Sequence, residues 1–265
     1  MKGHNYLGLA GVVFLALLIF AAVFAPRICR FSPYEQNLSE KLRSPSAEHL
    51  FGTDEYGRDI FARSVYAARV SLSVAAVAIV ISTVIGTVLG LAAGFFRGFV
   101  DSIIVKITDV FLCIPTFFLI LMVVAFWSPS IINIMIVIGI TSWPGLARLV
   151  RAEALSVAAR DYISAVRVLG FSKVRIMFVH ILPNVLAPVF VAVILGLGSA
   201  ILTESGISFL GLGVQPPFAS WGNMLASGRV YMGIAWWVSL WPGLAIFLTV
   251  LSFNLVGEML KESLA

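Results

Sequence analysis

Few residues in this sequence have the type and spacing that catalysis or phosphate binding would need. A Walker A loop requires a glycine followed directly by a lysine, because backbone N–H groups and the lysine hold the phosphates together. None of the lysines follows a glycine; they are Lys2, Lys41, Lys106, Lys173 and Lys261. The hydrolase motifs G-x-S-x-G and H-E-x-x-H are also absent. The sequence therefore predicts no catalytic residue and no ATP-binding loop.

Metal and cofactor binding are not predicted either. The histidines His4, His49 and His180 are scattered along the chain and form no cluster with the cysteines. Cys29 and Cys113 are far apart, and Cys113 sits in an apolar run. We interpret the cysteines as two unpaired thiols with no metal role.

The composition indicates that the chain lies in a lipid bilayer. Its 265 residues are 60% hydrophobic and only 12% charged, with a mean hydropathy of +1.02. A soluble domain carries roughly 25% charged residues, because its surface must face water. The net charge of +5, from scattered basic residues, does not predict nucleic-acid binding. These values predict an all-α integral membrane protein in contact with lipid.

Six apolar stretches approach the length of about 20 residues that a membrane-spanning helix needs. The predicted spans are residues 7–25, 70–96, two within 110–147 separated by a turn at 127–130, then 181–203 and 230–257. The first is too long for the apolar core of a signal peptide and lacks a cleavage site. Residues 1–69 are thus an N-terminal span with a polar segment, and residues 70–265 a five-helix core.

Ionisable side chains are nearly missing from the interiors of these spans. Ion-coupled transporters place such groups at membrane depth, where they carry protons or cations. Here Asp109 lies at the start of the third span, and Glu204 at the outer end of the fifth. We interpret Glu204 as an interfacial residue capped by water or a backbone donor, with proton coupling as the alternative.

Basic residues set the predicted orientation through the positive-inside rule. Residues 148–180 contain six of them against only Glu153 and Asp161, so this loop between the fourth and fifth spans is predicted to be cytoplasmic. Alternation then places both termini in the cytoplasm and residues 26–69 outside. That outer segment carries seven basic residues of its own, accompanied by six acidic residues.

The loop at about 151–180 contains a predicted amphipathic helix at 161–170. Asp161 is a good N-cap, because its carboxylate can accept from the free N–H groups of the first turn. Gly170 suits the left-handed conformation that ends a helix, and Ser172 can cap a second helix. One apolar stripe contains Tyr162, Ala165, Val166 and Leu169. Spacing alone leaves two interpretations, a structural connector and a docking element.

Residues 162–184 resemble the EAA loop of ABC-importer permeases. The matching positions are Ala165, Gly170 and Pro183. Ser164 stands where a glutamate is expected at the head of the motif, and Val166 stands where the second alanine is expected. In that family the loop carries a coupling helix that binds a groove of the ATPase subunit. The resemblance implies this docking role for Asp161, Tyr162, Ser164, Ala165, Val166, Leu169 and Gly170.

Further motifs narrow the resemblance to the C-type permease of peptide and nickel importers. They are residues 51–59, 208–217, 220–222, 241–245 and 253–255. The resemblance implies a non-catalytic subunit in a prokaryotic inner membrane that forms a heterodimeric pore with a second permease. It also implies two ATP-binding subunits inside and a solute-binding protein outside.

Residues 205–228 are uncharged and rich in glycine and proline, which makes them a poor spanning helix. Non-helical backbone at membrane depth is tolerated only inside protein or beside a water-filled cavity. We therefore predict a re-entrant external gate, with an ordinary surface loop as the alternative. The gate candidates are Glu204, Ser208, Phe209, Gly211, Gly213, Gln215 and Trp221. The motif at 51–59 is expected to brace the outer face rather than touch substrate.

Other function classes lack the features they would need. A secondary transporter or channel would need ionisable groups at mid-membrane, and a membrane enzyme would need a catalytic constellation. Within the importer class, peptides are the first choice of substrate and nickel chelates the second.

Overall fold

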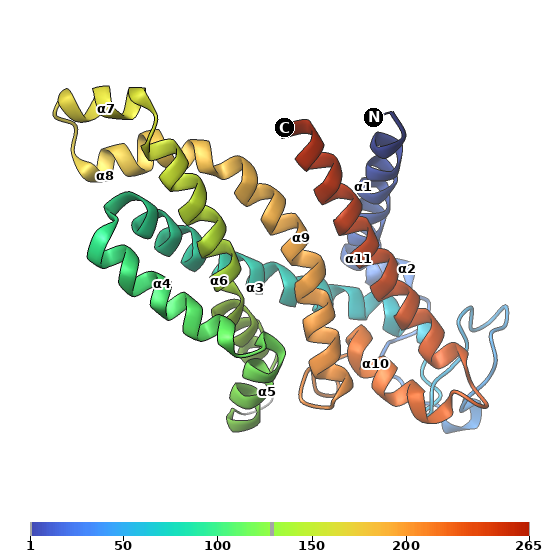
Figure 1. The fold of residues 1–265 in the computed structure, drawn as a ribbon. Helices are drawn as coiled ribbons and strands as arrows, with labels where there is room; N and C mark the ends of the chain where they lie inside the picture. Colours follow the sequence, from blue (N-terminus) through green and yellow to red (C-terminus); the bar gives the residue numbers. More distant parts are fainter. Residues whose placement is uncertain (1, 128–129, 265) are drawn as a thin grey trace.

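The computed structural model describes residues 2–127 and 130–264, which form helices joined by turns (Figure 1). The only extended pairing within these residues is an isolated bridge between Thr53 and Asp59. The predicted all-α membrane fold is confirmed.

Five stretches of helix are long and apolar enough to cross a membrane. They contain α1 (Lys2–Val23), α3 (Ile60–Phe96), α6 (Ile131–Ala158), α9 (Leu182–Phe209) and α11 (Trp237–Leu264). The stretch containing α9 starts earlier, with α8 (Lys173–Arg175) and the π-helical turn η2 (Ile176–Ile181). Shorter elements are α2 (Ala25–Ile28), η1 (Leu38–Glu40), α7 (Asp161–Val168), α10 (Trp221–Gly228) and η3 (Arg229–Tyr231).

A sixth candidate for a membrane span is a pair of helices with a sharp bend between them. α4 (Gly98–Cys113) and α5 (Thr116–Phe126) meet at an angle of 83°. Pro115 causes the break, because it has no N–H to donate and forces Ile114 into an extended conformation. The prediction of a single straight span beginning at residue 110 was therefore wrong. Trp127 and Ser130 flank α5 and α6, whereas residues 128 and 129 of the predicted turn lie outside the described residues.

Several spans are longer or shorter than hydropathy predicts. α3 begins at Ile60 rather than at residue 70, because the Asp59 carboxylate caps it by accepting from the Ala62 N–H at 2.7 Å. The division drawn between residues 69 and 70 therefore falls inside a helix. α6 continues to Ala158, so part of the predicted loop is helical, and α11 begins at Trp237 rather than 230.

α3 and α6 form the most extensive helix pair in the described residues. Glycines let the two backbones approach, since a Cβ on Gly90 would lie 2.5 Å from the Ala147 carbonyl oxygen. Close approach through small residues is how helices associate in lipid, where no hydrophobic effect drives them together.

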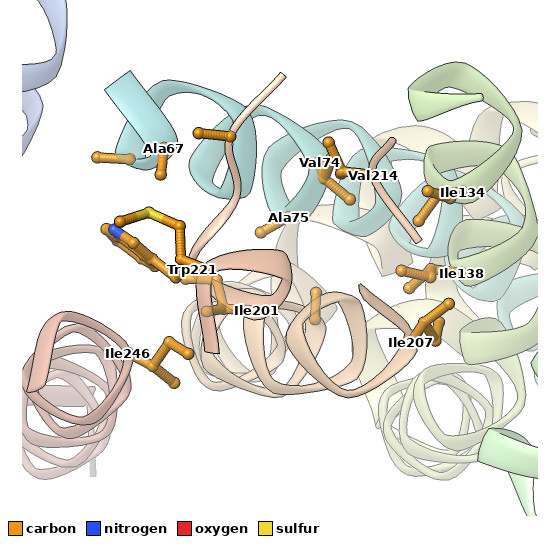
Figure 2. Packing of buried hydrophobic residues seen from close by; sticks show 14 of the residues in the cluster. Ala67, Val74, Ala75, Ile134, Ile138, Ile201, Ile207, Val214, Trp221 and Ile246 are labelled. Carbon is orange, nitrogen blue, oxygen red and sulfur yellow. The ribbon is translucent and has the colours of Figure 1, made fainter. Parts of the chain in front are cut away.

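α10 completes the core by packing against α9, α11 and α3. Figure 2 shows the Trp221 ring among Ala67 of α3, Ile201 of α9 and Ile246 of α11. The Trp221 indole N–H donates to the Ser64 carbonyl at 3.0 Å, which satisfies the one polar atom of this fully buried side chain.

Residues 29–59 are irregular and are anchored by polar contacts at the start of α3. Asp59 lies 2.8 Å from Nδ1 of His49, and the other ring nitrogen lies 3.2 Å from Glu40. Asp54 pairs with Arg58 at 2.7 Å. A segment with little helix of its own thereby gains a fixed position.

The same segment is also attached to the last helix. The Phe51 ring stacks on Trp241 with 3.9 Å between centroids, and the Trp237 indole N–H donates to the Thr53 carbonyl at 3.3 Å. Gly52 has φ +77°, and a Cβ there would lie 2.7 Å from the Trp237 ring. The motif at 51–59 therefore packs within the chain, as expected of a bracing element.

Candidate functional site

α7 lies at the same end of the molecule as the start of α1 and the end of α11 (Figure 1). The helix follows Arg160, which occupies the N-cap position without a side-chain cap bond. The prediction that Asp161 is the N-cap was wrong by one residue. Asp161 begins the first turn instead, where its carboxylate still interacts favourably with the helix dipole.

The end of α7 follows the predicted pattern. Gly170 has φ +79°, which confirms the left-handed conformation, and its N–H donates to the Arg167 carbonyl at 3.0 Å. A Cβ there would meet nothing within 4 Å, so backbone conformation alone favours glycine. Ser172 caps α8, as predicted, by accepting from the Arg175 N–H at 3.3 Å.

One side chain that the sequence analysis missed holds α7 in place. Ile163 is fully buried, in a cluster that includes Val150 of α6 and Ile181, and Val166 packs partly against it. The spacing of Ile163 and Val166, three residues apart, was the available signal. The Tyr162 hydroxyl adds a polar contact by donating to the His180 carbonyl at 3.3 Å.

The remaining face of α7 is open. Ser164 and Ala165 are exposed, Leu169 is 73% exposed and Val168 is 89% exposed. The predicted stripe is therefore divided, because Val166 turns toward the core while Tyr162, Ala165 and Leu169 stay accessible. A fixed short helix thus presents apolar side chains outward at one end of the molecule.

Glu204 lies in a polar cluster in the core. It has no exposed surface, and its carboxylate accepts from the hydroxyls of Ser208 at 2.6 Å and Ser71 at 3.0 Å. The interfacial interpretation, with a cap from water or backbone, was wrong. Ser71 is on α3, 133 residues away, and nothing in the sequence links the two.

This cluster also positions the turn after α9. The Ser208 hydroxyl accepts from the Val214 N–H at 3.0 Å while it donates to Glu204. Gly213 packs so closely on Ser208 that a Cβ would lie 2.0 Å from the hydroxyl oxygen. The turn is therefore attached to α9 and, through Glu204, to α3.

The other gate candidates lie in or beside the turn. Gln215 bridges it by donating to the carbonyls of Gly211 and Gly213, each at 3.0 Å. Gly211 has φ +83° and is exposed, and Phe209 is half-buried. After this turn the chain folds back through α10 beside α9. The role of these residues in gating stays a prediction.

Two ion pairs join α4 to α6. Asp101 accepts from Nε of Arg151 at 2.5 Å and from its Nη2 at 2.7 Å, and Asp109 pairs with Arg148 at 2.5 Å. Arg148 and Arg151 were assigned to the loop, but they lie inside α6. The two arginines neutralise Asp101 and Asp109, the acidic residues that lower the apolar character of α4.

One group of described residues, Glu40, Glu48 and His49, has ligand atoms close enough to hold a metal ion. Each already has a protein partner, including Arg43 at 2.7 Å from Glu40, so the group fits an ion-pair cluster. The two cysteines are free. Burial, with Asp59 nearby, raises the pKa of Cys29 to about 11, so its thiol is neutral at physiological pH.

Comparisons with known proteins identify the family. Residues 86–265 match the binding-protein-dependent transport system inner membrane component, and residues 4–45 match the N-terminal TM domain of oligopeptide transport permease C. The chain belongs to the binding-protein-dependent inner-membrane permeases. It is accordingly a multi-pass membrane permease of a transport system.

Individual relatives of this permease cover it almost entirely. The di/tripeptide transport system permease protein DppC of Pseudomonas aeruginosa is 43% identical over 98% of this chain and 88% of its own length. The dipeptide transport system permease protein DppC of Escherichia coli K12 is 44% identical over 98% of this chain and 89% of its own. The resemblance to C-type peptide permeases is confirmed.

The fold is also found in a solved structure. The MetNI methionine ABC transporter in an inward-facing conformation contains a chain that matches with a TM-score of 0.63. The match covers 78% of this permease and 98% of that chain at 18% identity, so it supports the shared fold.

Proposed function

We propose that this permease is one of two pore-forming subunits of an ATP-driven importer of di- and oligopeptides. The observation that carries the substrate class is the 43–44% identity, over 98% of the chain, to permeases named for dipeptide and di/tripeptide transport. Nickel chelates are the second candidate, and no observation in the structure favours them.

The proposed partners follow from the missing phosphate-binding loop and from the exposed apolar side chains of α7. It has no phosphate-binding loop of its own, so ATP hydrolysis belongs to two ATP-binding subunits in the cytoplasm. α7 is the element that docks on them, because it presents Tyr162, Ala165 and Leu169 outward while Ile163 holds it to the core. A second permease completes the pore, and an extracytoplasmic solute-binding protein delivers the peptide.

The turn at 210–220 and α10 form the outer gate. In Figure 1 both lie at the end of the molecule away from α7, and α10 lies between the turn and the irregular residues 29–59. Glu204 and Ser208 connect this turn to α9 and α3. Movement of these helices during the ATPase cycle would therefore move the turn as well.

An import assay tests the proposed function. A strain that lacks this subunit is expected to lose growth on an essential di- or oligopeptide and to regain it when the gene is restored. Its nickel-dependent enzyme activity serves as the internal control and is expected to stay normal. Loss of nickel uptake with peptide uptake intact would contradict the peptide proposal and make nickel chelates the proposed substrate.

Fusion proteins test the orientation. With both termini and α7 in the cytoplasm, alkaline phosphatase attached after Glu35 is expected to be active, because it folds outside. The same enzyme attached after Lys173 is expected to be inactive. The reverse pattern would show that the orientation is inverted and that α7 lies on the side of the membrane where no ATP is available.

A further inference from the structure

A hollow of about 280 Å³ lies where α3, α6 and α9 pack together. Its lining includes hydroxyl side chains and glycines from all three helices: Ser82, Ser142, Gly145, Gly196, Ser199 and Thr203. Two of these hydroxyls bond their own helix, since Thr203 donates to the Ser199 carbonyl at 2.9 Å and Ser199 to the Leu195 carbonyl at 3.4 Å. The hollow is thus uncharged, and hydroxyl groups lie among apolar side chains in its lining.

The chemistry of this lining restricts what it can accommodate. None of the described residues around the hollow is ionisable, so its wall neither attracts nor repels a charged side chain strongly. It also offers no histidine, cysteine or carboxylate, the side chains that coordinate transition metals. Hydroxyl groups can instead accept from and donate to peptide groups. The Thr83 hydroxyl, also in the lining, is buried and has no partner among the described residues.

Gly145 has no explanation in the packing of the chain. It lies inside α6, where glycine costs about 1 kcal/mol relative to alanine. Its φ is not positive, and a Cβ there would meet nothing within 4 Å. Gly139 of the same helix differs, because a Cβ there would lie 2.7 Å from Ile81. Neither backbone conformation nor close packing requires a glycine here, but a large side chain at position 145 would fill part of the hollow.

We infer that this hollow is the subunit's share of the substrate passage, and that the absence of a large side chain at Gly145 keeps it wide enough for a peptide. The uncharged hydroxyl lining lets peptides pass whatever the charge of their side chains. This inference rests on the proposed function and narrows its substrate class to short peptides of varied side-chain charge.

The test uses the complete transporter in proteoliposomes, with loaded binding protein in excess and the dipeptides Ala-Lys and Ala-Glu as probes. Gly145→Leu is expected to reduce import of both by about ten-fold or more, because a bulky side chain would narrow the hollow and passage depends on pore diameter. Gly145→Ala adds only a methyl group and is expected to retain import within about two-fold, since passage depends on pore diameter.

Gly243→Leu is the matched control. Gly243 also follows a proline inside a helix, Pro242 of α11, and the nearest atom to its added Cβ is Leu225 Cδ2 at 3.7 Å. It lies outside the hollow, so import is expected to be normal. A loss as large as that of Gly145→Leu would assign the effect to the proline–glycine sequence and overturn the inference.

A charge variant tests the lining itself. The unaltered transporter is expected to import the two dipeptides at similar rates. Ser142→Asp places a negative charge in the hollow, so import of Ala-Lys relative to Ala-Glu is expected to rise by about ten-fold, because Coulomb interactions are strong at low dielectric. An unchanged ratio would overturn the assignment of Ser142 to the passage.

Two outcomes separate the failures. If the unaltered transporter imports neither dipeptide nor any longer peptide, the proposed function fails and this inference fails with it. If it imports peptides and Gly145→Leu does too, only this inference fails. Dissociation of Gly145→Leu from the second permease would also overturn it, because that face would then be a subunit contact.

Discussion

Leu169→Asp is expected to remove most of the ATPase stimulation by loaded binding protein while the permease stays in the membrane at near-normal abundance. Leu169 is largely exposed, so the chain loses little packing when it is replaced. At an interface a buried leucine contributes about 1.5–3 kcal/mol, and an unpaired carboxylate there costs more. Stimulation is therefore expected to fall by about ten-fold or more, since 1.4 kcal/mol corresponds to a factor of ten.

Two further variants make this result specific to docking. Gly170→Val forces a β-branched residue into a left-handed conformation, at a cost of roughly 1–2 kcal/mol, and is expected to misplace the end of α7. Arg167→Ala removes only a distant contact, 5.9 Å from the Phe95 ring, and is expected to have little effect. The measurement is ATPase activity in reconstituted transporter, beside a pull-down of the ATP-binding subunits. If Leu169→Asp and Gly170→Val leave both unchanged, α7 is only a connector.

Glu204→Ala is expected to lower the thermal stability of the purified transporter and its abundance in the membrane. The substitution leaves a cavity in the core and removes the acceptor of the Ser71 and Ser208 hydroxyls. An unsatisfied buried polar group costs about 1–3 kcal/mol. The hydroxyls can turn to bond their own helices, which recovers part of this loss. We expect a net loss of about 3 kcal/mol from the cavity and the lost hydrogen bonds together.

Glu204→Gln is the control that separates packing from charge. The amide has nearly the same shape and can still bond both hydroxyls, because each hydroxyl can either donate or accept. Stability and peptide import are therefore expected to stay close to those of the unaltered protein. Normal folding with import abolished would show instead that transport uses the ionised carboxylate, which is the proton-coupling alternative.

Hydropathy predicted the long helices well, because crossing a bilayer requires a local run of apolar residues. The prediction of α1 and α9 needed no information from elsewhere in the chain. α4 was missed, since Asp101 and Asp109 interrupt its apolar character and the arginines that neutralise them come from α6. The start of α3 was misplaced because the charged Arg69 interrupts the apolar run, although in the structure it donates to the Ala22 carbonyl of α1. Such pairings are invisible to a sliding window.

The candidate sites show the same division between local and distant information. Gly170 and Ser172 were predicted from helix-capping rules that depend on adjacent residues. Ile163 was overlooked because the more obvious stripe lies on the exposed side of α7, whereas the buried side is defined by contact with α6 and η2. The partnership of Glu204 with Ser71 required the packing of α9 on α3.

The stacking of Phe51 on Trp241 has a consequence for how the protein is made. The Thr53 carbonyl and the Trp237 indole that bonds it are 184 residues apart. At 5–20 residues per second, a ribosome needs roughly 10–40 seconds to synthesise that interval. Residues 29–59 therefore stay without their final contacts until the last helix has been synthesised. Completion of translation is thus the event that allows this segment to reach its final structure, and a truncated nascent chain leaves it open to proteases.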